Sequence, residues 1–195
     1  PSWPAPFGKG RPGWHIEDTA ITEKFFGPQY DIHGGGRDLI FPHHEAEITQ
    51  QESASGKKPF VKYWMHVAFL VNKEQKMSKS LGNFETVREL LKKYPKEVLR
   101  FHLLSSYYRS PLDYSADIFK QSQAAINRIT EFIQKLKNVP TSQVGTLEEV
   151  DKYLTETKEK FVWAMDNDFN TPEAFASIFE MIRVINPPLT ENKVS

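Results

Sequence analysis

The segment KMSKS at residues 76–80 carries the side chains best suited to chemistry on phosphate groups. It brings two lysines and two serines together, and Gly82 follows, which leaves room for a turn. Transfer at phosphorus requires positive charge where negative charge grows in the transition state, and lysine ammonium groups can provide it. A solvated basic turn has the same composition, so these residues alone leave both interpretations open.

His43 and Glu47 are candidate metal ligands. A helix that begins at Pro42 puts both side chains on one face, because residues four apart in a helix are neighbours. Imidazole and carboxylate are common ligands of zinc. The alternative is an exposed His–Glu pair that only supports the helix. A nearby glycine run has further histidines around it, where a single histidine is more often hydrogen-bonded than metal-binding: His15, His33 and His44.

Two aromatic positions could contact a ligand. Trp14 could close over a small molecule, but the sequence alone favours a place in the core. Residues 107–109, Tyr-Tyr-Arg, could stack on RNA and pair with it. For these three residues the default expectation is an aromatic cluster that packs two helices together.

The elements expected to position these residues form a strand–helix–strand unit. A short strand over 29–33 runs into the glycines of 34–36, a helix spans about 43–52, and a mostly apolar strand spans 63–71. The lysine-rich loop 72–83 follows that second strand. Ligands of open α/β sheets bind outside the carboxyl ends of the strands, which is where the glycine run and the lysine loop both fall.

The flanking regions differ from this unit. Residues 1–15, rich in proline and glycine, are expected to form a loop, so the first regular element is expected only at Gln29. Beyond Phe84 the pattern is helical. The expected features are a capping box at 86–89 with an apolar stripe of Val87, Leu90 and Leu91, a helix from Pro95 to Leu104, an amphipathic helix over 118–136, a linker over 138–145, a second capping box at 146–149 and a last helix from Thr171-Pro172. This predicts half of an α/β nucleotide-binding domain followed by a helical bundle, with a boundary near residue 114.

The composition is that of an ordinary soluble globular protein. Of 195 residues 39% are hydrophobic and 26% charged, and 25 basic residues balance 25 acidic ones. Any contact with RNA must therefore use a local patch. The sequence has no apolar stretch near twenty residues and no secretory leader, so we expect a cytoplasmic protein that does not bind membranes. Cysteine is absent, and the abrupt start without methionine suggests a fragment.

Six segments, in this order, resemble those of the cysteinyl-tRNA synthetases: GKGRPGWHIE (8–17), DIHGGGRDLIFPHHEAE (31–47), YWMH (63–66), KMSKSLGNF (76–84), YRSPLDYS (108–115) and DFNTPEA (168–174). The resemblance covers nearly the whole chain. The lysine segment is similar to the second signature of class I aminoacyl-tRNA synthetases, and the first two segments single out the cysteine enzyme.

The resemblance implies a fold and a division into domains. The fold class is α/β, with the second half of a class I Rossmann-type catalytic domain over 1–71, the KMSKS loop and contact fold over 72–114, and a helical domain leading to anticodon recognition over 115–195. The first class I signature, His-x-Gly-His, is expected upstream, so this chain alone is expected to be inactive. The implied partners are ATP, cysteine and tRNA(Cys), and a monomer is expected.

The resemblance also implies roles for individual residues. Lys79 matches the lysine that stabilises the phosphates in the transition state, and Lys76 supports it. Gly34, Gly35, Gly36 and Asp38 match the positions that hold the adenosine. Trp14 matches the tryptophan that closes on the amino acid.

Zinc is the cofactor implied by the resemblance, because it binds the thiolate of cysteine and rejects serine. The family ligands are two cysteines, a histidine and a glutamate, and His43 and Glu47 match the last two. Asp18 stands where the family has its second cysteine. A carboxylate can bind zinc, but it is a harder ligand that shifts the metal preference.

Two other functions fit part of this pattern. One is a related ligase that joins cysteine to a small amine, against which the helical segment after Ser115 argues. The other is a non-catalytic paralogue that binds tRNA or a nucleotide.

Overall fold

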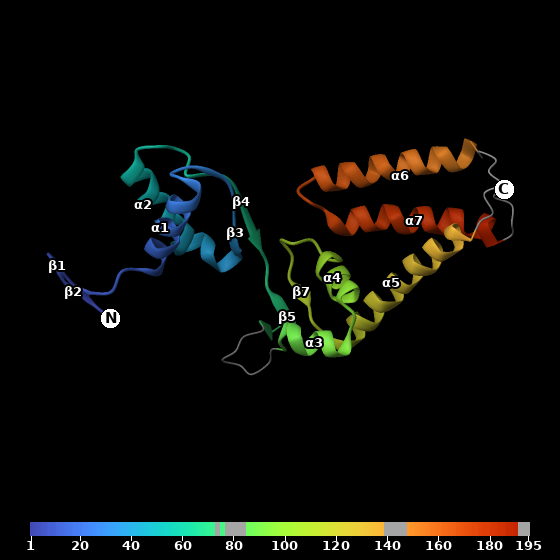
Figure 1. Cartoon of the computed structure of the whole chain (residues 1–195), viewed down its shortest axis with the longest axis horizontal. Coiled ribbons are helices and arrows are strands. Elements are labelled where there is room, and N and C mark those ends of the chain that lie inside the picture. Colours follow the sequence, from blue (N-terminus) through green and yellow to red (C-terminus); the bar gives the residue numbers. More distant parts are fainter. Residues whose placement is uncertain (73–74, 77–84, 139–147, 191–195) are drawn as a thin grey trace. The chain divides into compact units, whose positions relative to one another are not determined.

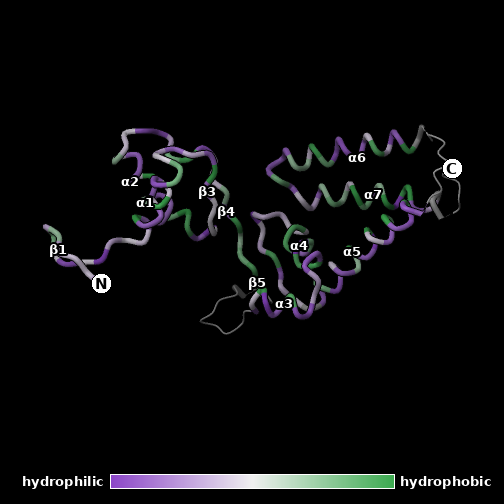
Figure 2. Tube along the Cα trace, viewed as in Figure 1, coloured by the Kyte–Doolittle hydropathy of each residue, from purple (hydrophilic) through white to green (hydrophobic). Residues whose placement is uncertain are grey.

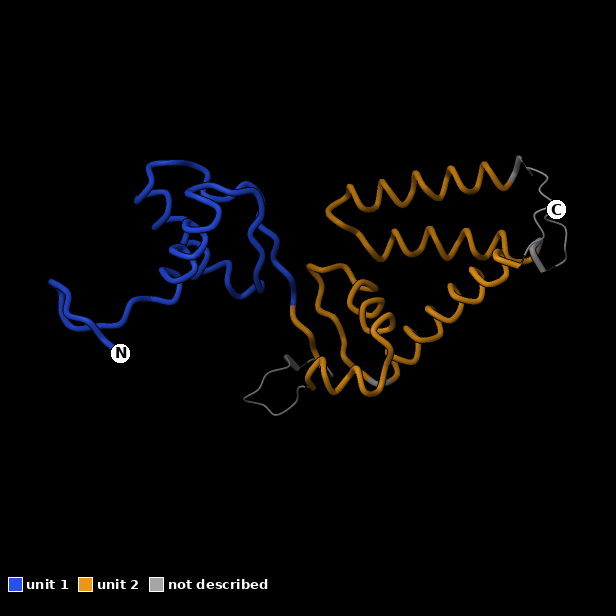
Figure 3. Tube along the Cα trace, in the orientation of Figure 1, with its two compact units in different colours: residues 1–68 blue, residues 69–195 orange. Residues whose placement is uncertain are grey.

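The structure is a computed structural model that describes residues 1–72, 75–76, 85–138 and 148–190 (Figure 1). The chain forms two compact units, Pro1–Ala68 and Phe69–Ser195, which are described separately (Figure 3). The domain limits expected after residues 71 and 114 remain predictions.

The first unit begins with regular structure that the sequence did not lead us to expect. Strands β1 (Trp3–Ala5) and β2 (Gly8–Gly10) pair antiparallel, and helix α1 spans Trp14–Phe26. The expectation of a loop up to Gln29 was therefore wrong. The apolar residues of α1 are not gathered on one face, so the helix lacks the periodic pattern by which helices are recognised.

The strand–helix–strand unit is present. Strand β3 (Tyr30–Gly36) leads through the turns η1 (Arg37–Leu39) and η2 (Ile40–His44) into helix α2 (Glu45–Ser55), and strand β4 (Val61–Val67) follows. β3 and β4 pair in parallel, with His33 opposite Trp64 and Gly35 opposite His66. The helix expected over 43–52 is confirmed, preceded by an irregular turn in which Phe41 has an extended backbone.

The interior of the first unit is unusually polar. Its buried apolar residues are Phe60 and Val61, whereas its buried polar residues are Thr19, His43, His44, Glu47 and Gln51. Burying polar groups costs free energy unless they gain partners, so a polar interior in a small unit indicates a functional site.

The second unit begins with a small sheet of order β6-β5-β7. β5 (Leu70–Asn72) pairs antiparallel with β6 (Gln75–Lys76) and parallel with β7 (Leu112–Asp113). The single strand expected over 63–71 is wrong in this respect: β4 ends at Val67 and β5 begins at Leu70 in the other unit. A continuous apolar run does not reveal such a break, because both pieces are apolar.

Helices form the rest of the second unit. They are α3 (Val87–Lys93), α4 (Lys96–Leu104), α5 (Ala116–Lys137), α6 (Glu148–Asp166) and α7 (Thr171–Thr190). The capping box at Thr86 is confirmed, because Glu89 N donates to Thr86 Oγ1 and Thr86 N donates to Glu89 Oε2. The apolar stripe predicted for α3 is not confirmed, because only Leu90 is buried, while Val87 and Leu91 are exposed. The second expected capping box, at 146–149, begins outside the described residues. Most of the expected linker over 138–145 also lies outside them.

Two apolar clusters hold these helices together. One joins α3, α4 and α5 through Leu90, Val98, Leu99 and Phe119. The other joins α5 and α7 around Phe132, Ile182 and Ile185. Along α6 and α7 hydrophobic and hydrophilic turns alternate, as amphipathic helices require (Figure 2). Within the described residues, every helix is too short or too polar to cross a membrane.

Candidate metal centre

Elements of the first unit bring Asp18, His43 and Glu47 together. Asp18 lies in the second turn of α1, and His43 and Glu47 lie one helical turn apart across the junction of η2 and α2. α1 and α2 pack against each other, and Thr19 Oγ1 donates to Gln50 Oε1 at 3.3 Å across their contact. The candidate ligands are thus held by packed helices, which fixes their positions better than a loop would.

Two carboxylates meet at a single nitrogen of this centre. His43 Nε2 lies 2.9 Å from Asp18 Oδ2 and 2.9 Å from Glu47 Oε1. A ring nitrogen carries at most one proton, so it cannot donate to both oxygens. Two carboxylates this close favour a cation between them. Ligand atoms of the three side chains all lie within 4.8 Å of one another, as binding of one ion requires.

Glu47 is the strongest sign that the three residues can bind a cation. Its exposed fraction is 0%, and neither carboxylate oxygen has a hydrogen-bond partner among the described residues. Burial raises the pKa of Glu47 to about 7, an effect that His43 opposes and Asp18 reinforces. A bound metal ion would supply the partner that this carboxylate lacks, so the three residues fit such an ion.

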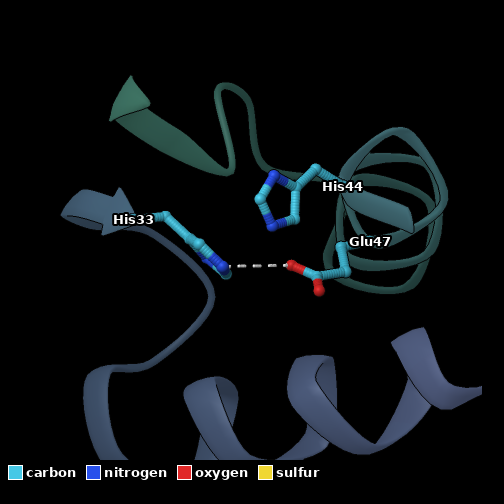
Figure 4. Close-up of side chains that lie close together, drawn as sticks. All are labelled: His33, His44 and Glu47. Atoms are coloured by element: carbon cyan, nitrogen blue, oxygen red, sulfur yellow. Dashed lines mark ion pairs between the residues drawn. The ribbon is translucent and has the colours of Figure 1, made fainter. Parts of the chain in front are cut away.

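A layer of histidines lies next to this centre (Figure 4). His44 Nδ1 is 2.8 Å from His66 Nε2, and the His33 ring stacks on Trp64 with 4.7 Å between the ring centroids. Burial, followed by repulsion from the other histidines, lowers the pKa of His44 to about 4. Burial also lowers the pKa of His33. Both imidazoles are therefore neutral near pH 7, the form that binds metals.

Trp14 lies next to His43, one of the candidate metal ligands. It is the first residue of α1, its exposed fraction is 60%, and its ring lies 4.4 Å from the His43 ring. The expectation that Trp14 belongs to the core is therefore wrong in this structure. An exposed aromatic ring beside a candidate metal ligand is suited to cover a small molecule bound there.

The glycine run has a packing role that sequence reasoning did not provide. A Cβ atom at Gly35 would lie 2.5 Å from His44 Cε1, so a side chain at this position would displace the imidazole. At Gly36 a Cβ atom would lie 2.6 Å from Asp38 Oδ1. Gly34 is exposed and has only Met65 O near its Cβ position, at 3.8 Å. Of the three glycines, Gly34 thus has the most open surroundings.

The candidate lysines belong to the second unit. The backbone of Lys76 is in β6, where it pairs with Val71 of β5. Lys79 lies outside the described residues. The structure therefore brings Asp18, His43, Glu47 and Trp14 together within the first unit, and it gives no position for the Lys79 side chain.

Comparison with known proteins shows the family to which this chain belongs. Residues 1–124 match the model of the class I (C) tRNA synthetase catalytic domain, and residues 160–195 match the DALR domain. This chain belongs to the cysteinyl class I tRNA synthetases. It is 47% identical over 195 residues to the cysteine--tRNA ligase of Carboxydothermus hydrogenoformans, and 48% identical over 198 residues to that of Geobacter metallireducens.

This synthetase chain spans about two fifths of the length of these relatives. It covers 42% of the Carboxydothermus protein and 41% of the Geobacter protein, whereas the alignments include 100% and 99% of the chain. Its fold is similar to that of LeuRS from Agrobacterium radiobacter K84, solved as a ternary complex with tRNA and LeuAMS. The TM-score is 0.70 at 13% identity, over 96% of this chain and 29% of that one. A class I synthetase fold is therefore shown, with a helical domain after it.

The structure contains a polar cluster around Asp168 that the sequence analysis did not predict. Asp168, in the turn between α6 and α7, accepts hydrogen bonds from Tyr107, Tyr108 and Arg109. The Arg109 Nε–Asp168 Oδ2 distance is 2.6 Å. Hydrogen bonds from Arg109 and both tyrosines hold the pKa of Asp168 far below its usual range. Residues 107–109 thus bind the α6–α7 turn through their polar groups, a role that a local sequence pattern could not reveal because Asp168 is distant in sequence.

Proposed function

We propose that the chain acts as part of a cysteine–tRNA ligase, which uses ATP to activate cysteine and then joins it to tRNA(Cys). The observation that carries this proposal is the meeting of Asp18, His43 and Glu47 beside the exposed ring of Trp14. Family membership supports the reaction, and this geometry supports the choice of amino acid. A cytoplasmic monomer is part of the same proposal.

The choice of amino acid is the demanding part of this function. Serine differs from cysteine by oxygen in place of sulfur, and an apolar pocket separates such similar side chains only modestly. Asp18, His43 and Glu47 would hold a zinc ion, which supplies a ligand preference for thiolate over hydroxyl. Glu47 and His43 would hold the ion from the buried side, since their side chains are 1% and 9% exposed. Asp18, at 34%, lies toward solvent.

Trp14 and the histidine layer would shape the rest of the cysteine pocket. The Trp14 ring next to His43 would exclude water from a bound side chain. His33 and His44 would form a neutral floor, because burial keeps their pKa values low.

In the proposed reaction an oxygen of the cysteine carboxylate forms a bond to the α-phosphorus of ATP, and the bond from that phosphorus to pyrophosphate breaks. The terminal ribose hydroxyl of the tRNA then attacks the acyl carbon, and AMP leaves. Lys79, supported by Lys76, would stabilise the negative charge on the phosphates. The adenosine would lie along residues 34–36, with Asp38 binding the ribose hydroxyls.

Charging of tRNA by the full-length protein tests this function directly. We expect cysteine, ATP and tRNA(Cys) to give cysteinyl-tRNA, and Lys79→Ala to reduce cysteine-dependent ATP–pyrophosphate exchange by about a hundredfold or more. Lys57→Ala removes an exposed lysine away from the motif and serves as the matched control, with exchange unchanged. Failure of the wild-type protein to charge tRNA, or near-normal exchange by Lys79→Ala, would count against the proposal.

A further inference from the structure

The two residues that flank the lysine segment in the second unit are attached to the same small sheet. Lys76 is the last residue of β6, and Glu85 begins the next described part of the chain. Lys76 pairs with Val71 of β5, and the backbone N–H of Tyr114, just after β7, donates to Val71 O at 2.7 Å. The Tyr114 hydroxyl donates to Glu85 Oε2 at 2.9 Å. Tyr114 is therefore linked to both flanks, through its backbone and through its side chain.

We propose that Tyr114 is a positioning residue for the lysine segment and that it acts through Glu85. The inference rests on the ligase function proposed above, in which Lys79 and Lys76 stabilise the phosphates of ATP. Lys79 precedes Glu85 by six residues in the sequence, so the place of Glu85 restricts the place of this lysine. A misplacement of about 1 Å in a group that must meet the transition state can cost about a hundredfold in rate.

The Glu85 carboxylate is held from two sides. Lys93 Nζ, on α3, lies 2.6 Å from Oε1, while the Tyr114 hydroxyl is bonded to Oε2. Hydrogen bonds from Lys93 and then Tyr114 lower the pKa of Glu85, so the carboxylate is ionised at neutral pH and both bonds are charge-assisted. The Lys93 side chain is 60% exposed, and water screens an ion pair of this kind. The Tyr114 hydroxyl is therefore the better-protected restraint.

The Tyr114 ring is itself fixed by packing. It lies edge-on to Phe119 of α5, with 5.3 Å between the ring centroids, and it packs against the apolar cluster of α3, α4 and α5. Burial, followed by the hydrogen bond to Glu85, raises the pKa of Tyr114, so the hydroxyl keeps its proton and donates. A ring held by its backbone and by aromatic contacts presents its hydroxyl in a defined direction.

Close packing does not fix Glu85 in the same way. Glu85 and Tyr114 line a cavity of about 110 Å³, together with Leu90 of α3 and His102 of α4. Empty space beside a side chain removes the contacts that would otherwise restrain it. The residue after Glu85 is Thr86, whose capping box fixes the start of α3. The position of Glu85 is thus set by this cap and by its two polar bonds.

Tyr114→Phe in the full-length protein tests the inference, because it removes the hydroxyl and keeps the ring. We expect kcat of cysteine-dependent ATP–pyrophosphate exchange to fall about tenfold. KM for cysteine and the thermal unfolding midpoint should stay unchanged, since the candidate cysteine pocket lies in the first unit and the ring packing is retained. Tyr153→Phe, at an exposed position on α6, is the matched control and should leave exchange unchanged.

Variants of Glu85 separate positioning from a general loss of structure. Glu85→Gln keeps an oxygen that can accept from the Tyr114 hydroxyl, so it should lose less activity than Glu85→Ala. Adding Tyr114→Phe to Glu85→Ala should cause no further loss in kcat, because both changes remove the same hydrogen bond.

Two results would overturn the inference while the wild type is active. One is exchange by Tyr114→Phe within about twofold of wild type, and the other is a double variant in which the two single losses combine in full. A wild-type protein without exchange would overturn the ligase proposal and this inference with it. The two failures are therefore distinguishable.

Discussion

At the scale of single residues, Glu47 dominates the energetics of the candidate centre. It is fully buried without a hydrogen-bond partner among the described residues, and its pKa is raised to about 7. In the metal-free protein this carboxylate opposes folding whenever it is ionised. With a metal bound, the same burial strengthens its interaction with the ion.

Glu47→Gln is therefore expected to stabilise the metal-free protein. The folded-state pKa of about 7 lies above the ordinary glutamate value of 4.5, so the folded state retains a proton that the unfolded state loses. Stability of the metal-free wild type should fall as pH rises from about 4.5 to 7, by about 3 kcal/mol. Urea unfolding at several pH values measures this. A wild type whose stability rises over that interval, or a less stable Glu47→Gln variant at pH 8, would contradict it.

Asp18 contributes a hard carboxylate oxygen to the candidate metal ligands, which affects how tightly they bind zinc. Replacing it with cysteine adds a thiolate, which zinc binds more tightly than a carboxylate. We expect Asp18→Cys to increase zinc affinity about tenfold or more, and Asp18→Asn to decrease it. Competition with a coloured chelator measures both affinities. Equal zinc affinity in all three proteins would show that Asp18 is not a ligand.

At the scale of elements, the Asp168 cluster fixes the α6–α7 turn to the segment that leads into β7. Both Asp168 and Phe169 have a φ of 55°, so the turn adopts a left-handed backbone at two residues that are not glycine. Its hydrogen bonds from Tyr108 and Arg109 compensate this local cost. β7 also pairs with β5, which in turn pairs with β6, the strand containing Lys76.

Asp168→Asn tests this connection with little backbone change, because asparagine tolerates the left-handed conformation. We expect a loss of about 1 kcal/mol in stability, a modest value because the Asp168 and Arg109 side chains are 41% and 48% exposed. Asp151→Asn, an exposed aspartate on α6, is the matched control with no measurable loss. Thermal unfolding of both variants gives the comparison. An equal loss in both would remove any special role for Asp168.

Elements with a strong local signal could be predicted from the sequence, and others could not. α5 was predicted from apolar residues at helical spacing, and the α3 cap from Thr86 and Glu89. α1 was missed because its apolar residues follow no helical period and proline and glycine precede it. For the site, His43 and Glu47 could be paired by spacing along one helix. Asp18 was identified only by family resemblance, because tertiary packing brings α1 to α2.

The layer of histidines beside the candidate metal centre shows the same limit more clearly. His33 and His44 were noted as neighbours of the glycine run, but no rule of spacing links a residue of β3 to a residue of η2. Their contact depends on the turns η1 and η2 between β3 and α2, and on the absence of a side chain at Gly35. Such contacts require the folded chain.

At the scale of the whole molecule, the chain covers about two fifths of its relatives, and its described candidate ligands lie in the first unit. Catalysis by a synthetase requires the ATP-binding signature and the lysine segment to be positioned together. We therefore expect the 195-residue chain alone to charge no tRNA, while the full-length protein does so. Cysteine-dependent charging by the purified chain, free of host enzyme, would refute this expectation.

The central claim is that a metal ion held by Asp18, His43 and Glu47 selects cysteine. The most direct test is metal analysis of the full-length protein and of His43→Ala, combined with pyrophosphate exchange for cysteine and serine. We predict bound zinc and strong preference for cysteine in the wild type, and in His43→Ala less zinc together with a preference lowered by about a hundredfold or more. Near-zero zinc in both proteins, with the preference for cysteine unchanged, would contradict the claim.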